Sequence, residues 1–148
     1  MSGMALADYL THDHQHCDDL FAEAENAVAA ADWGSAAQAF ASFDAATRRH
    51  FEREETVLVP AFETRTGMTG GPTMVMRGEH IQMRDALAAM ADALGKQVAP
   101  EFLGISETLL MLMRQHNLKE EQILYPMTDQ ALAGEADALI GRMSALSE

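Results

Sequence analysis

The sequence predicts an all-α protein, an up-down-up-down antiparallel four-helix bundle with a short extra helix at the C-terminal end. Three observations predict this fold. Most of the chain is rich in Ala, Leu, Met, Glu and Gln, which favour helix, and poor in β-branched residues. Apolar residues recur at steps of three and four, the period of one helix face. Glycine and proline gather in a few short stretches, which leave long uninterrupted segments between them.

These stretches divide the 148 residues into four long segments and a tail. The clearest loop is Gly-Met-Thr-Gly-Gly-Pro at 67–72, and weaker breaks lie at 32–35 and 95–100. We therefore expect long helices at about 3–31, 34–65, 72–94 and 100–128, and an amphipathic tail helix at about 131–146. Short connections between long helices favour antiparallel neighbours, and the length fits a single domain over 1–148, with the bundle at about 3–128.

The composition excludes several classes of partner. The formal net charge of −13, from 23 acidic and 10 basic residues, disfavours nucleic acid, whose phosphates need clustered Lys and Arg. No apolar run approaches the roughly 18 residues of a membrane span. The N-terminal stretch has no basic segment and is interrupted by Asp8, so it is a poor signal peptide. With Cys17 the single cysteine, we expect a cytoplasmic protein without nucleic-acid or membrane partners.

Polar side chains interrupt the predicted apolar stripes. Six histidine and glutamate residues lie within stripes that otherwise resemble core: His14, His50, Glu54, His80, His116 and Glu120. His50 and Glu54 are four residues apart, as are His116 and Glu120, so each pair lies on one helix face about one turn apart.

The same residues belong to an internal duplication at an offset of 66 residues. His14 maps onto His80, and the pair of the second helix maps onto the pair of the fourth. Several neighbours repeat at the same offset: Glu55/Glu121, Leu58/Leu124, Pro60/Pro126, Asp19/Asp85 and Arg48/Arg114. Two helical hairpins packed about a pseudo-twofold axis would bring all six polar side chains to one place.

Four imidazoles and two carboxylates suit iron, manganese or zinc. Each carboxylate has two oxygens, so Glu54 and Glu120 can each bridge two ions, and each ion can take two histidines. Coordination positions then remain for an oxo or hydroxo bridge and for a small exogenous ligand. Without cations, the burial of these groups would be costly. The sequence therefore predicts a two-metal site.

This pattern resembles the hemerythrin family, the His-His-Glu cation-binding domains, over roughly residues 5–128. The family has a His on helix one, His-x-x-x-Glu on helix two, a His on helix three, and His-x-x-x-Glu or a close variant on helix four. The resemblance implies a non-heme di-iron centre with oxo or hydroxo and carboxylate bridges, in which zinc or manganese could substitute. Oxygen-carrying members have a second His one turn after the helix-three His, where this sequence has Arg84. The implied centre has one imidazole fewer, which opens a coordination position.

The resemblance implies three candidate functions. The first is binding of O₂, or of a related small diatomic or peroxide ligand, for sensing, storage or delivery, and we expect this rather than a dedicated enzyme. The second is a di-iron redox enzyme that acts on peroxide or NO or supports iron–sulfur repair. The third is a metal-responsive regulatory protein. The sequence does not fix the oligomeric state, and a homodimer is one alternative.

Two neighbouring carboxylates compete with the predicted ligands. Glu55 and Glu121 follow them directly and could replace them at a His-to-acid spacing of five. We favour Glu54 and Glu120, which have a spacing of four.

Acidic residues also precede each lone histidine. Asp13 and Glu79 could accept hydrogen bonds from imidazole N–H groups. Adjacent helix residues point about 100° apart, however, which favours solvated positions for both. His12 and His16 share a face other than that of His14, and we expect them at the surface.

Four further residues invite an interpretation. We expect Cys17 to be a small buried residue, and a thiol redox sensor beside the metals is the alternative. Tyr125 corresponds to Val59 and breaks the repeat, so it is either an interface aromatic or a hydrogen-bond donor near the site. Pro60 and Pro126 each lack a backbone donor, and we expect them to bend or end their helices.

Overall fold

The computed structural model describes residues 4–146, and this part of the chain is all-helical with no strand, as predicted. The elements in chain order are α1 (Leu6–Ala29), α2 (Trp33–Arg53), the π-helix η1 (Glu54–Leu58), α3 (Val59–Thr66), α4 (Pro72–Gly95), α5 (Ala99–Lys119), the π-helix η2 (Glu120–Leu124), α6 (Tyr125–Ala131) and α7 (Ala136–Ser144).

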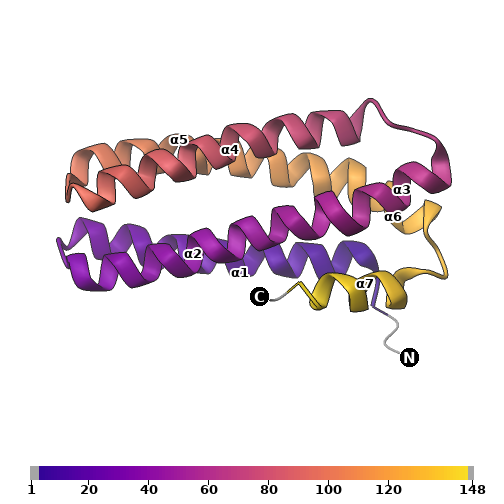
Figure 1. Cartoon of the computed structure of the whole chain (residues 1–148), viewed down its shortest axis with the longest axis horizontal. Helices are drawn as coiled ribbons and strands as arrows, with labels where there is room; N and C mark the ends of the chain where they lie inside the picture. Colours follow the sequence, from indigo (N-terminus) through magenta and orange to yellow (C-terminus); the bar gives the residue numbers. More distant parts are fainter. Residues whose placement is uncertain (1–3, 147–148) are drawn as a thin grey trace.

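Four long helical runs lie lengthwise beside one another (Figure 1). The helices α2, η1 and α3 form one run over 33–66, and α5, η2 and α6 form another over 99–131. Contacts are most numerous between α1 and α2 and between α4 and α5, so the chain is built from two helical hairpins. This arrangement is compatible with the predicted four-helix bundle.

Local chemistry explains where the helices begin and end. The side chain of Asp32 accepts a hydrogen bond from the Ser35 backbone N–H at 3.2 Å and caps α2. Pro72 lies in the first turn of α4, where its missing N–H is not needed. Gly67 ends α3 with a φ of 75°, a left-handed conformation that glycine adopts without a steric penalty.

The tail helix is shorter than predicted. We expected a helix at about 131–146, but residues 132–134 form a turn and α7 spans Ala136–Ser144. The turn contains Gly134 with a φ of 91°, which interrupts the helix.

Of the two roles predicted for Pro60 and Pro126, bending or ending their helices, the second is wrong, because the helical runs continue to Thr66 and Ala131. Each proline lies two residues after a π-helical segment. In an α-helix a proline ring collides with the carbonyl four residues earlier and supplies no donor to it. A π turn bonds across five residues instead, so it relieves this conflict. The two π segments begin at Glu54 and Glu120, two of the predicted ligands.

Two apolar clusters lie on either side of the polar stripe residues. One cluster lies toward the α1–α2 connection and includes Phe21, Phe43, Leu87 and Phe102. The other lies toward the α3–α4 connection and includes buried residues of η1, η2 and α7: Val57, Leu58, Leu124, Leu139 and Met143. The predicted ligands therefore occupy a polar layer inside an apolar interior.

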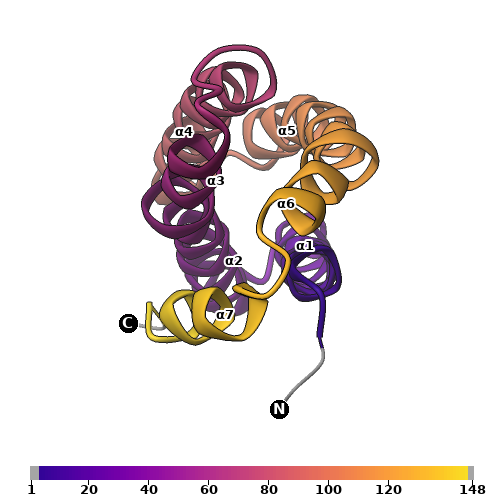
Figure 2. The ribbon, with the colours of Figure 1, turned by 90° about the vertical axis from the view of Figure 1, so that its right-hand side faces the viewer.

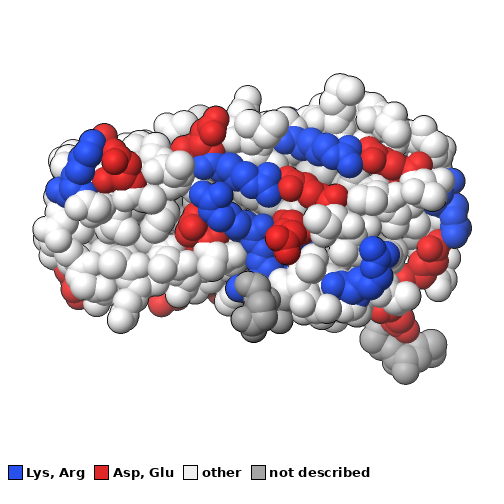
Figure 3. Space-filling view, in the orientation of Figure 1, with Lys and Arg blue, Asp and Glu red and all other residues white. Residues whose placement is uncertain are grey.

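The view along the bundle shows α7 on the side of α1 and α2, away from α4 and α5 (Figure 2). It packs on η1 and α1. On the face shown in Figure 3, Lys and Arg side chains lie beside Asp and Glu side chains. The ion pairs of the protein include Arg77–Glu63 and Arg84–Glu55. Within the described residues, no helix is long and apolar enough to cross a membrane.

Candidate metal centre

All six predicted ligands meet in the middle of the bundle, and each is at most 4 % exposed. Their nitrogen and oxygen atoms form two groups, in each of which the candidate ligand atoms lie within 4.8 Å of one another. The first group contains His14 and His50, and the second contains His80 and His116. Both groups contain Glu54 and Glu120. Two carboxylates shared between two imidazole pairs is the arrangement expected for bridging ligands.

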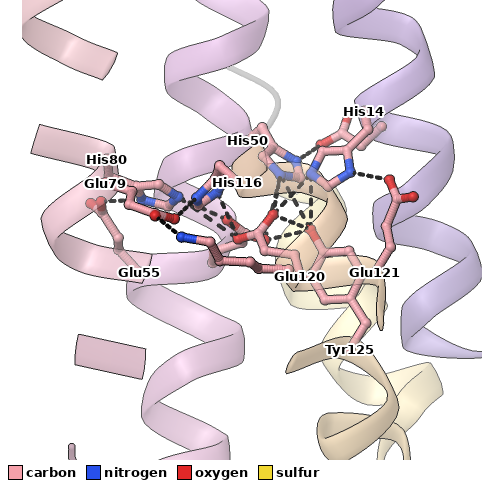
Figure 4. Close-up of polar contacts among 12 residues, drawn as sticks. His14, His50, Glu55, Glu79, His80, His116, Glu120, Glu121 and Tyr125 are labelled. Atoms are coloured by element: carbon pink, nitrogen blue, oxygen red, sulfur yellow. Dashed lines mark hydrogen bonds and ion pairs between the residues drawn. The ribbon is translucent and has the colours of Figure 1, made fainter. Parts of the chain in front are cut away.

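The four imidazoles share one pattern of polar contacts (Figure 4). Each ring places Nδ1 against a carboxylate outside the centre and turns Nε2 inward. The Nδ1 contacts are His14–Glu121 at 2.7 Å, His50–Asp13 at 2.7 Å, His80–Glu55 at 2.7 Å and His116–Glu79 at 2.9 Å. In the neutral ring that metal binding requires, Nδ1 then carries the proton and Nε2 offers its lone pair.

The prediction that Asp13 and Glu79 are solvated is wrong. Each carboxylate accepts a hydrogen bond from an imidazole of a neighbouring helix, Asp13 from His50 and Glu79 from His116. The turn of about 100° between adjacent helix residues directs them away from the histidine that follows in sequence and toward the next helix.

A basic side chain forms an ion pair with each of these two carboxylates. Arg53 Nη1 donates to Asp13 Oδ2 at 3.0 Å, and Lys119 forms an ion pair with Glu79. Burial alone would raise the pKa of Asp13, but the hydrogen bond and charge of His50 together with Arg53 lower it to about 2. The carboxylate is therefore ionised and remains a hydrogen-bond acceptor for His50.

Glu54 and Glu120 point into the centre, whereas Glu55 and Glu121 lie on the outer side of the imidazoles. Burial opposes ionisation of Glu55, but the hydrogen bonds from His80 and Arg84 lower its pKa to about 2. The consecutive acids thus have different positions, one toward the candidate ions and one behind the rings.

The second group contains four buried atoms that lack a hydrogen-bond partner: Glu54 Oε1, His80 Nε2, His116 Nε2 and Glu120 Oε2. His80 Nε2 lies 3.1 Å from Glu54 Oε1, and His116 Nε2 lies 3.0 Å from Glu120 Oε2, but neither contact has the geometry of a hydrogen bond. Buried polar atoms are nearly always paired, and an unpaired one costs about 1–3 kcal/mol. A cation bound among these atoms would satisfy all four.

The first group is arranged around a residue that is not among the six. Tyr125 Oη lies 2.5 Å from Glu54 Oε2, 2.8 Å from Glu120 Oε1, 3.1 Å from His14 Nε2 and 3.4 Å from His50 Nε2. Burial and the negative charges of Glu120 and Glu54 raise the pKa of Tyr125 well above its usual range, so its hydroxyl stays protonated and donates to a carboxylate. Of the two roles the sequence left open for Tyr125, the structure supports the hydrogen-bond donor.

Ionised carboxylates and protonated imidazoles balance one another in the centre. Burial opposes the ionisation of Glu120, but His116, His14 and His50 outweigh it and hold its pKa well below the usual range. Burial likewise opposes protonation of His116, but Glu120 raises the pKa of His116 to about 9. The pKa of His50 is raised as well, chiefly by Glu54 against the effect of burial. A metal ion would take the place of these protons.

Arg84, which stands where oxygen carriers have a further histidine, does not point into the centre. Its guanidinium binds both oxygens of Glu55, at 2.7 and 2.9 Å, and lies 5.1 Å from the centroid of the Phe51 ring. The same ring stacks on His80 with centroids 4.1 Å apart. Arg84 therefore holds His80 from two sides, through Glu55 and through Phe51.

Three other residues of α1 lie where their sequence positions predict. His12 and His16 are exposed, and Cys17 is buried. Burial raises the pKa of the Cys17 thiol, which keeps it protonated and unreactive.

The chain matches a known protein family. The family model of the hemerythrin HHE cation binding domain matches residues 5–128. No curated protein and no solved structure matches the chain.

Proposed function

Because the chain belongs to the hemerythrin HHE cation-binding domain family, we propose that it binds two iron ions and that the loaded centre binds O₂ or a related small ligand such as NO. The proposed metal ligands are His14, His50, Glu54, His80, His116 and Glu120. The observation that carries the proposal is the pair of ligand groups that share two carboxylates. We also propose that residues 1–148 form one domain, an up-down-up-down bundle made of two duplicated hairpins.

Each proposed ion has two imidazole nitrogens and two carboxylate oxygens from the protein. Structural zinc sites are closed with four ligands, whereas iron in a mixed nitrogen and oxygen site takes more and keeps positions open. When bound, the metal pair supplies open coordination positions and the electrons for redox chemistry. The choice of iron over zinc or manganese rests on this ligand chemistry and on the family.

The protein's own part in this function is to orient the metal-binding imidazoles and to shield the centre from bulk water. The carboxylates on the four Nδ1 atoms fix the tautomer and the plane of each ring. The apolar clusters on both sides keep bulk water from the polar layer. A small uncharged molecule would therefore meet oriented metal-binding side chains in a site shielded from bulk water.

The direct test is to load the protein with Fe²⁺ without oxygen, to measure metal per chain, and then to record absorption spectra before and after O₂ or NO is added. Two irons per chain and a reversible new absorption band are expected. The metal-free protein, treated in the same way, is the control. One zinc per chain, or a spectrum that changes with neither O₂ nor NO, would refute the proposal.

A second candidate function, redox chemistry on peroxide or NO, is favoured by one observation. The Tyr125 hydroxyl contacts all four residues of the first ligand group, so a buried hydrogen-bond donor lies beside any molecule bound there. Reduction of H₂O₂ to two water molecules needs two protons and two electrons, which ascorbate can supply in the assay. Multiple-turnover consumption of H₂O₂ faster than that by the same amount of free iron is expected for an enzyme, and an equal rate would exclude it.

A further inference from the structure

A hollow of about 230 Å³ opens beside the second ligand group, between α4 and η2. Its walls include Val75 and Met76 from α4 and Ile123 and Leu124 from η2, and it reaches His116 and Glu120. We call this hollow the α4–η2 groove. The walls are mainly apolar, and the Glu79–Lys119 ion pair lies at its side. It therefore connects the surface with two of the proposed ligands.

The duplication predicts a matching groove in the first hairpin, but there it is covered. Ile123 is 51 % exposed, whereas Val57, its equivalent at the 66-residue offset, is 5 % exposed. Val57 belongs to the same apolar cluster as Leu139 and Met143 of α7. The tail helix thus fills the position that stays open in the second hairpin.

Polar contacts hold α7 in this place. Arg53, the equivalent of Lys119, donates from Nε to the Met143 carbonyl at 3.0 Å. The hydroxyls of Tyr9 and Ser144 lie 3.3 Å apart, and Tyr9 is the equivalent of Val75. Figure 2 shows α7 on the α1–α2 side alone. One hairpin is therefore sealed and the other is not.

We propose that the α4–η2 groove is the access route and outer binding pocket for a small uncharged ligand, and that α7 restricts access to this one side. The inference, which rests on the proposed function, adds that the ligand approaches the His80–His116 position rather than the His14–His50 position. Apolar walls favour an uncharged diatomic molecule over a hydrated ion. The net charge of −13 and the nearby Glu79 also disfavour anions.

The size of the groove suits this role. A water molecule occupies roughly 30 Å³ in the liquid, so a hollow of 230 Å³ holds several molecules of diatomic size. One indole ring in place of a wall side chain would fill much of it. Ile123 and Val75 are partly exposed, so a larger side chain at either position can be accommodated without disturbing the core.

The kinetic test compares Ile123→Trp and Val75→Trp with the wild type in stopped-flow mixing of NO with the iron-loaded, reduced protein. Met111→Trp, on an exposed part of α5 outside the groove, is the matched control. Metal content and helical circular dichroism are measured first for every variant. We expect association slowed roughly tenfold or more in the groove variants and unchanged in the control. Wild-type rates in both groove variants would overturn the proposal.

A second measurement needs no metal. Xenon is an apolar atom that enters dry cavities, and its effect on methionine methyl resonances is followed in the metal-free full chain. We expect a shift of the Met76 methyl, lost in Ile123→Trp, and no shift of the methyl of Met143, a buried residue of α7. A shift of Met76 with no NO binding would refute the proposed function but retain the groove. An unshifted Met76, or an equal shift of Met143, would overturn the groove itself.

Discussion

The hydroxyl of Tyr125 lies 2.5 Å from Oε2 of Glu54, at the point where the four residues of the first ligand group face one another. It also lies within hydrogen-bond distance of Glu120. One phenol thus partners the two carboxylates that both ligand groups share. Without a metal ion, it is a neutral donor that acts together with the protonated imidazoles to offset the cost of burying these carboxylates.

Tyr125→Phe is therefore expected to destabilise the metal-free protein by about 1–3 kcal/mol, because the buried pair of carboxylates loses its hydroxyl donor. Metal binding would then raise the melting temperature more in this variant than in the wild type, since a cation satisfies the same oxygens. Thermal unfolding with and without metal measures both effects. Tyr9→Phe, which removes only an exposed hydroxyl contact with Ser144, serves as the control and should change little. Equal stability of metal-free Tyr125→Phe and wild type would contradict the assignment.

The shared position of Glu120 predicts a difference in metal stoichiometry between two variants. Glu120→Ala removes an oxygen donor from both ligand groups, so both ions should be retained poorly. His14→Ala removes a nitrogen from the first group alone and should leave about one ion per chain. Metal analysis after gel filtration distinguishes these outcomes. Two ions per chain in His14→Ala, or one in Glu120→Ala, would show that the two groups are not joined as proposed.

The stability of the metal-free protein should fall as pH rises above about 6.5. The pKa of His116 is raised from 6.5 to about 9 in the folded chain, so its contribution is fully present below pH 6.5 and lost as pH rises through 9. A shift of this size corresponds to roughly 3 kcal/mol. Urea unfolding in the presence of a chelator, at pH 6 and at pH 9.5, measures it. His12→Gln, at an exposed site, should show the wild-type dependence.

Metal binding should have the opposite dependence on pH. A cation displaces the protons of His50 and His116, whose pKa values are raised, so the apparent metal affinity should increase up to about pH 9. The rise in melting temperature on metal addition should consequently be larger at pH 8.5 than at pH 6.5. Proton release on metal addition, measured in a weakly buffered solution, provides an independent check. Absence of proton release at pH 7 would contradict this account.

The helices and the six buried polar residues could be predicted because both leave a regular residue spacing in the sequence. Steps of three and four residues define a helix face, and the 66-residue offset selects His14 over its neighbours. The exposure of His12 and His16 and the burial of His14 follow from that choice. A pattern of this kind needs no knowledge of how the helices are packed.

Contacts that depend on the register between helices were not predictable in the same way. Asp13 reaches His50 and Glu79 reaches His116 only because adjacent helices align to place these side chains together. The π segments that begin at Glu54 and Glu120 depend on backbone bonding, which the spacing of apolar residues does not record. The prolines after them were a usable signal, since Pro60 and Pro126 repeat at the same offset within long helical segments.

Arg84 gives the last prediction, because its two contacts act on one histidine. Arg84→Ala frees Glu55, which binds His80 Nδ1, and removes the cation over Phe51, which stacks on the His80 ring. Loss of a group that orients a metal-bound histidine typically costs roughly 10–100-fold in metal affinity. We expect that loss for one ion of the pair, measured by competition with a chromophoric chelator.

The chain offers a matched control for this variant. Arg77 also binds both oxygens of a glutamate, Glu63, at 2.7 and 3.0 Å, but neither residue contacts a predicted ligand. Arg77→Ala removes an equivalent, partly exposed ion pair between α4 and α3 and should leave metal affinity unchanged. Equal metal affinities for Arg84→Ala and Arg77→Ala would show that Arg84 has no positioning role. A loss confined to Arg84→Ala, and restored in part by Arg84→Lys, would show that the cation positions His80 through Glu55.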